Sequence, residues 1–209
     1  MSKKIRISLI IAIIFFILVT FTIVIFKPKY ELNKAIEYLK KGNYIESYNY
    51  IESKDNDENK VIIKELISQI FYNRAGKGLK KIDDISNKCT DIVRKVDINN
   101  IDYTLDDNIN VDVKALGKYM SLKEEISKDM IDSEIAESYD IYFNIIEYIS
   151  ENFYDVLNHI KDKEFIDKID ELSSDMLKIS NDCNYYTDNH NFNPKTKKIF
   201  LKIENYIIK

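Results

Sequence analysis

Histidine and cysteine are the residues best suited to acid–base and nucleophilic chemistry near neutral pH, and this chain has two of each. His159 and His190 do not stand in the H-E-x-x-H spacing of a zinc protease. Cys89 and Cys183 allow one intramolecular disulfide, but they form no C-x-x-C pair. We therefore expect no catalytic, cofactor-binding or metal-binding site, and we expect the protein not to be an enzyme.

Residues 55–66 begin like a calcium-binding loop, with the pattern D-x-D-x-N. Lys60 stands where that loop requires glycine, and Leu66 stands where it requires glutamate, so calcium binding is not expected. Further along the chain lies a local group of bases: Arg74, Lys77, Lys80 and Lys81. Such a group is either a solvated helix face or a contact site for an anionic lipid or wall polymer.

Residues 181–193, NDCNYYTDNHNFN, show no apolar periodicity and are predicted to form a loop. Aromatic side chains gather in it: Tyr185, Tyr186, His190 and Phe192. Aromatic rings supply a large contact area for a partner or a ligand. We therefore take these four residues as the candidate partner or ligand surface.

Residues 7–26, from Ile7 to Phe26, form an uncharged apolar run long enough for a helix to cross the bilayer's hydrocarbon core of about 30 Å. No small residues follow it, so a signal-peptidase site is not expected. This pattern predicts an uncleaved, single-pass transmembrane helix. The basic tail at 1–6 is expected to remain in the cytoplasm and residues 27–209 to lie outside the cell membrane.

Residues 31–54 show apolar positions at helical spacing on both sides of Gly42. Gly42, Tyr44, Ser47 and Ile51 follow the G-x-Y-x-x-A-x-x-x-Y spacing of a tetratricopeptide repeat, with Ser47 in place of alanine. Over 32–54 the chain thus resembles one repeat of that family, which implies a helical hairpin. No second copy follows at the period of 34 residues, so a peptide-binding array is not expected.

The rest of the chain predicts further helices and no strands, since glycine and proline are scarce, at 4 and 2 residues. Apolar stripes predict helices at 58–74 and 79–96, with a break at 75–78 and a loop at 97–112. A helix is expected at 113–131, with Ser121 and Glu124 as a capping box if a new helix begins there.

The most regular pattern is a series of apolar residues spaced 4-3-4-3-4-3-4: Ile135, Tyr139, Tyr142, Ile146, Ile149, Phe153, Val156 and Ile160. Its flanking positions carry no charge, which favours burial within one chain over a dimeric coiled coil. A polar turn at 161–164 predicts an antiparallel helix at 165–179. Asn193 and Pro194 predict the N-cap and first position of a final helix.

The fold class is therefore expected to be all-α: one N-terminal transmembrane helix followed by a multi-helix bundle. Residues 1–29 hold five of the 31 bases and no acid, whereas the remaining residues hold all 35 acids. An acidic domain repels phosphate backbones, so no nucleic-acid partner is expected. We expect a structural or protein-interaction component of a bacterial cell envelope, with a protein partner and the lipid bilayer as contacts. The alternative is a membrane-anchored helical module that binds a ligand or wall polymer.

Overall fold

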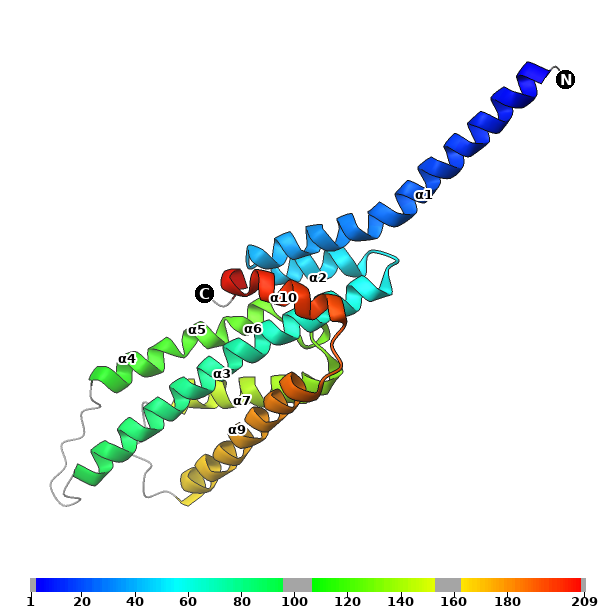
Figure 1. Ribbon diagram of the computed structural model, residues 1–209. Coiled ribbons are helices and arrows are strands. Elements are labelled where there is room, and N and C mark those ends of the chain that lie inside the picture. The colour runs from blue at the N-terminus through cyan, green and yellow to red at the C-terminus, as the bar shows by residue number, and fades with distance from the viewer. Residues whose placement is uncertain (1–2, 96–106, 153–162, 208–209) are drawn as a thin grey trace. The chain divides into compact units, whose positions relative to one another are not determined.

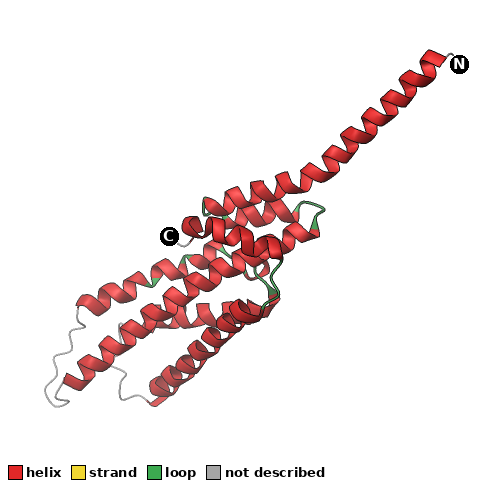
Figure 2. Cartoon of the chain, in the orientation of Figure 1, coloured by secondary structure: helices red, strands yellow, loops and turns green. Residues whose placement is uncertain are grey.

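The computed structural model describes residues 3–95, 107–152 and 163–207, and this part of the chain is almost entirely helical (Figures 1 and 2). The helices are α1 (Lys3–Lys40), α2 (Tyr44–Glu52), α3 (Asp57–Lys95), α4 (Asp107–Ala115), α5 (Gly117–Met120), α6 (Leu122–Glu125), α7 (Ala136–Asn152), α9 (Lys163–Asn189) and α10 (Pro194–Ile207). No strand occurs among the described residues, as Figure 2 shows, and the predicted all-α class is confirmed there. The chain divides into two compact units, Met1–Ile63 and Lys64–Lys209.

In the first unit, α1 is one continuous helix of 38 residues with Pro28 inside it. Its apolar part is long and apolar enough to cross a membrane, and none of that segment is buried in the protein. The side chains described within the predicted span are exposed, as Phe15 (68%) and Phe21 (63%) illustrate.

The C-terminal end of α1 and the short helix α2 form a hairpin around Gly42. Gly42 has a φ of +79°, a left-handed conformation that glycine adopts without steric cost. Leu39 and Ile51 are fully buried between the helices. The buried Ser47 hydroxyl donates a hydrogen bond of 2.8 Å to the Ala35 carbonyl, so this polar residue between the two helices is satisfied.

In the second unit, α3 does not break at residues 75–78, so that prediction is wrong. Ala75 and Gly78 face the core, and the ring of Tyr142 lies directly against Gly78. Glycine in a helix interior costs only about 1 kcal/mol relative to alanine. The burial of Ala75 and Gly78 against the core outweighs that cost and keeps the helix continuous.

The segment that follows also departs from the sequence-based expectation. Residues 107–112, expected in a loop, belong to α4. The expected helix at 113–131 is divided into α4, α5, α6 and a short 3-10 turn, Lys128–Met130, and a second 3-10 turn follows at Ser133–Ile135. A helix does begin after Ser121, but the capping box is absent because the Ser121 hydroxyl donates to the Lys118 carbonyl instead. Buried apolar residues at irregular spacing hold these short pieces to the core: Ile109, Val113, Leu116, Leu122, Ile126 and Met130.

The 4-3 series is buried within one chain as far as α7 is described. Tyr139, Tyr142, Ile146 and Ile149 are at most 7% exposed. Phe153, Val156, Ile160 and His159 lie outside the described residues. Around Phe71 of α3, three aromatic rings of α7 pack with centroid distances of 5.3, 5.8 and 6.4 Å. Helices α7 and α9 run antiparallel, as predicted and as Figure 1 shows, with Ser138 at the start of α7 bonded to Asp182 near the end of α9.

Candidate functional site

The four predicted surface residues do not form one surface. The predicted loop at 181–193 is wrong, because α9 continues through Asn189 and only residues 190–193 are non-helical. Tyr186, His190 and Phe192 pack against one another, with ring centroids 4.4 to 5.2 Å apart. Tyr186 and Phe192 are buried, whereas Tyr185 is 68% exposed on the other side of the helix. The aromatic group is therefore mostly interior.

His190 lies between two carboxylates contributed by other segments. Its Nδ1 is 2.9 Å from Glu134 Oε2, and its Nε2 is 3.2 Å from Glu65 Oε1. Asp132 Oδ2 lies 3.8 Å from Nε2. Burial lowers the pKa of His190, but the hydrogen bonds to Glu134 and Glu65 outweigh it and the net pKa is raised. The geometry thus favours an imidazolium that donates from both nitrogens.

Glu65 is the most enclosed of these carboxylates, with its side chain 3% exposed. It accepts the Asn193 N–H at 3.0 and 3.2 Å and also the Thr196 hydroxyl. Asn193 Oδ1 in turn accepts the Lys195 N–H at 2.9 Å, which confirms Asn193 as the N-cap of α10. A carboxylate at this position also complements the positive end of the α10 dipole.

Asp132 completes the cluster. It accepts the Tyr186 hydroxyl, and its own N–H donates to Ser68 Oγ at 2.8 Å. Burial raises the pKa of Asp132, and burial together with the Asp132 hydrogen bond raises the pKa of Tyr186. We call the set Glu65, Ser68, Asp132, Glu134, Tyr186, His190, Asn193 and Thr196 the polar junction. It joins α3, the second 3-10 turn, the end of α9 and the start of α10.

The polar junction holds four segments of the chain together through hydrogen bonds. Both nitrogens of His190 are engaged by carboxylates, so neither offers a lone pair to a substrate. Among the described residues, no group of three or more His, Cys, Asp or Glu side chains is placed to hold a metal ion. Nearby Cys183 is free and buried, and burial raises its pKa to about 12, which keeps it a thiol at neutral pH.

The sequence offered one signal for this cluster. Glu65 stands among Ile62, Ile63, Leu66 and Ile67, so a helical turn that is otherwise apolar carries an acid. A buried acid needs a partner, and His190 is one of only two histidines available. Asp132 and Glu134 gave no such signal, because they lie in a segment without periodicity.

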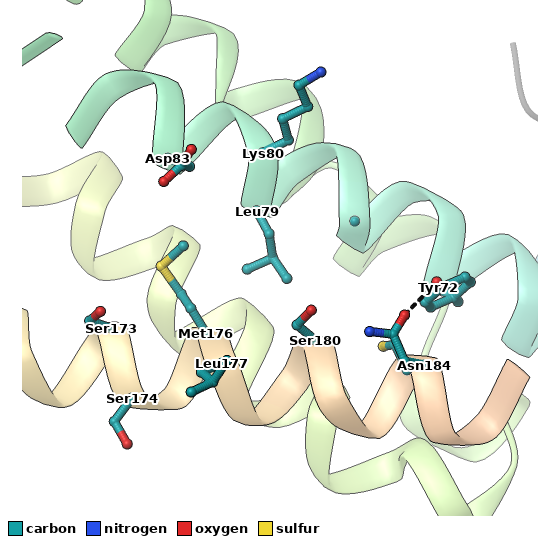
Figure 3. Close-up of a pocket in the computed structure, with 12 residues that line it drawn as sticks. Tyr72, Leu79, Lys80, Asp83, Ser173, Ser174, Met176, Leu177, Ser180 and Asn184 are labelled. Carbon is teal, nitrogen blue, oxygen red and sulfur yellow. Dashed lines mark hydrogen bonds between the residues drawn. The ribbon is translucent and has the colours of Figure 1, made fainter. Parts of the chain in front are cut away.

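A groove opens between α3 and α9 further along the same pair of helices (Figure 3). Its volume is about 790 Å³. At one end of the groove, Tyr72 of α3 forms a hydrogen bond of 3.3 Å with Asn184 of α9. At the other end, Asp83 of α3 lies near Ser173 of α9, so the two helices are antiparallel. Figure 3 shows Leu79 and Met176 pointing into the space from opposite helices.

The groove has an apolar floor and a polar rim. Leu79, Met176, Leu177 and Cys183 supply apolar surface, and Leu177 is 64% exposed. Rim side chains are hydroxyls, an amide and one charge of each sign: Ser173, Ser174, Ser180, Asn184, Lys80 and Asp83. A smaller hollow of about 380 Å³ lies beyond Tyr72, where Phe192, Phe200 and Leu201 line it beside α3.

Two members of the basic group on α3 serve structure rather than binding. Arg74 pairs with Glu125 at 2.6 Å, and Lys81 pairs with Asp112, as does Lys88. Hydrogen bonds from both lysines lower the pKa of Asp112. These ion pairs fasten α4 and α6 to α3.

No protein-family model matches this chain, and comparison with curated proteins and with solved structures finds no match.

Proposed function

We propose that this chain is a membrane-anchored interaction protein of a bacterial cell envelope, and that it binds an amphipathic helix of a partner protein in the groove between α3 and α9. The observation that carries the proposal is the exposed apolar side chain of Leu177 beside Met176 and Leu79 in an open groove. Exposed apolar surface with a polar rim is typical of protein contact sites.

The shape of the groove favours a helix as its occupant. Two antiparallel helices form its walls, and a third helix can pack along such a pair by placing apolar side chains at i, i+3 and i+4 on the floor. The mixed rim, with Lys80 and Asp83 of opposite charge, suits the polar flanks of such a helix. Among the described residues, His190 is paired with carboxylates and Cys183 is buried, which fits a binding role better than a catalytic one.

The binding experiment uses the full chain in its native membrane. A photo-crosslinking amino acid at Leu177 is expected to give a discrete protein adduct. Mass spectrometry then identifies the crosslinked peptide, and its sequence is expected to have the pattern of an amphipathic helix. The matched control is Val111 on α4, which is also apolar and 64% exposed but lies outside the groove. Adducts of equal yield at both positions, or none at Leu177, would refute the proposal. An adduct with a small molecule or polymer would favour the ligand-binding alternative.

The anchor is tested separately. We propose that Ile7–Phe26 spans the cell membrane with the N-terminus in the cytoplasm, and the basic tail before the apolar segment supports this orientation. The full chain is expected to resist alkaline carbonate extraction, and a protease added to intact cells is expected to cut the C-terminal domain. Full protection in intact cells, with cleavage only after lysis, would reverse the orientation.

A further inference from the structure

The last helix is basic, whereas residues 30–193, which lie between the basic N-terminal segment and this helix, are acidic. Residues 194–209 contain five lysines and one glutamate, a net charge of +4, in a protein whose formal net charge is −4. Four of these lysines lie on α10: Lys195, Lys197, Lys198 and Lys202. Strong local charge opposite in sign to the rest of the protein marks a surface that attracts an anionic partner.

The lysines of α10 are exposed, and Lys197 also borders the smaller hollow, with its Nζ 5.7 Å from the centroid of the Phe192 ring. Thr196 and Ile203 are 0% and 2% exposed, so the side of α10 that carries them packs on the domain. All four lysines are exposed, and two large side chains are exposed with them, Leu201 at 74% and Tyr206 at 63%. Among the described residues, Lys198 and Lys202 form no ion pair. This contrasts with α3, where Arg74 and Lys81 are held by carboxylates.

The polar junction fixes the orientation of α10 and therefore of its exposed lysines. Glu65 binds the Asn193 N–H and the Thr196 hydroxyl, which immobilises the first turn of α10 on α3. The lysines are therefore presented by a rigid element. A rigid basic face loses little conformational freedom when it meets a surface, apart from that of the side chains themselves.

We propose that the lysine face of α10, defined as Lys197, Lys198, Leu201 and Lys202, docks on a bilayer surface that contains anionic lipid. The proposal depends on the membrane anchor proposed above, which holds the domain beside the bilayer and raises the local concentration of lipid. Each lysine near an anionic surface strengthens attachment about fivefold. Exposed Leu201 in the middle of the basic face favours lipid over a soluble polyanion, because only a bilayer offers it an apolar layer.

The chain contains no tryptophan, so one introduced tryptophan is a unique optical probe. Full-length Leu201→Trp is reconstituted in phosphatidylcholine vesicles with or without phosphatidylglycerol, and its fluorescence is quenched by lipids brominated on the acyl chain. We expect quenching and a blue-shifted emission only with phosphatidylglycerol, and loss of both at high salt. The matched control is Tyr185→Trp on the exposed side of α9, which should remain unquenched.

A second variant tests the charges directly. In the Leu201→Trp background, Lys197→Gln, Lys198→Gln and Lys202→Gln together should weaken attachment by about two orders of magnitude, with circular dichroism showing an unchanged fold. Quenching that is equal in neutral vesicles, equal at Tyr185→Trp, or unchanged by the triple substitution would overturn the proposal. The proposal would also be overturned if brominated lipid did not quench the tryptophan while soluble polyphosphate alone shifted its emission to the blue. Flotation of the vesicles separates the two proposals: a chain that does not float refutes the anchor and this inference together, whereas floating without quenching refutes only this inference.

Discussion

Helices α3 and α9 meet in two different ways along their length. At the polar junction, Glu65 and His190 are enclosed and hydrogen-bonded to other segments. About two to five turns away, the same helices line a groove in which Leu177 is exposed. Buried polar groups with complete partners specify one arrangement of the chain, whereas exposed apolar surface contributes little to stability. This contrast underlies our proposal that the junction stabilises the fold and that the groove binds a partner.

The largest effect is expected at the centre of the junction. Glu65→Ala removes the acceptor for Asn193, Thr196 and His190 and should lower the free energy of unfolding by about 3–5 kcal/mol. Denaturant unfolding of the full chain in detergent, followed by circular dichroism, measures it. The control is Glu171→Ala, which removes only a surface pair with Lys168 and should cost at most about 1 kcal/mol. Equal effects of the two substitutions would mean that the junction does not stabilise the fold.

The two glycines on α3 offer a smaller and sharper comparison. A Cβ at Gly78 would collide with the buried ring of Tyr142, so Gly78→Ala should destabilise the fold by about 1–3 kcal/mol. Gly76 lines the groove with open space around it, so Gly76→Ala should stabilise the helix by about 1 kcal/mol. Thermal unfolding of both variants measures the difference. Opposite signs are required; destabilisation by Gly76→Ala would mean that the groove is filled within the chain.

The junction should also make stability depend on pH. The pKa of His190 is raised, so its stabilising contribution is complete below the ordinary histidine pKa and is lost as the pH rises through the folded-state pKa. At lower pH, the raised pKa of Asp132 acts in the same direction and the lowered pKa of Asp112 acts in the opposite one, so the test of His190 is confined to the histidine range. Denaturant unfolding, measured from below the ordinary histidine pKa to above the folded-state pKa of His190, should show a free energy of unfolding that falls as the pH rises. The substitution His190→Gln should flatten this part of the curve of stability against pH. An unchanged curve in that variant would show that His190 is not charged in the folded protein.

The smallest effect on stability is expected in the groove. Leu177→Gln should change the free energy of unfolding by no more than about 0.5 kcal/mol, because the side chain is 64% exposed. The same substitution should abolish crosslinking of a probe placed at the neighbouring Ser180, which also lines the groove. If Leu177→Gln lowered the free energy of unfolding but left crosslinking unchanged, Leu177 would stabilise the fold and would not bind a partner.

Sequence periodicity predicted the helices well where one face is buried continuously. The series Leu172, Met176 and Ile179 continues in the same spacing through Cys183, Tyr186 and His190, and α9 follows it to Asn189. The loop prediction failed because polar residues on the exposed side masked this continuation. Two of them bond to their own helix, since Thr187 donates to the Cys183 carbonyl and Asn189 to the Tyr185 carbonyl.

The candidate site was less predictable because its parts are distant in sequence. Glu65 and His190 are 125 residues apart, and no local pattern links them. The groove is lined by residues 72–83 of α3 and 173–184 of α9, which are far apart in sequence, so no local pattern predicts it. Tyr186 and Phe192 were expected at a contact surface because of their size, but large rings are as readily buried as exposed.

Helix α1 passes from its apolar segment into the first hairpin without interruption, from Lys3 to Lys40. Asn59 Nδ2 donates to the Pro28 carbonyl at 2.8 Å, so the start of α3 is fastened to the same helix just beyond the apolar segment. A flexible linker would absorb tilting and rotation of a membrane span, but a continuous helix transmits both as a stiff lever. If α1 spans a bilayer as proposed, a change in bilayer thickness that tilts the span would therefore also tilt the hairpin.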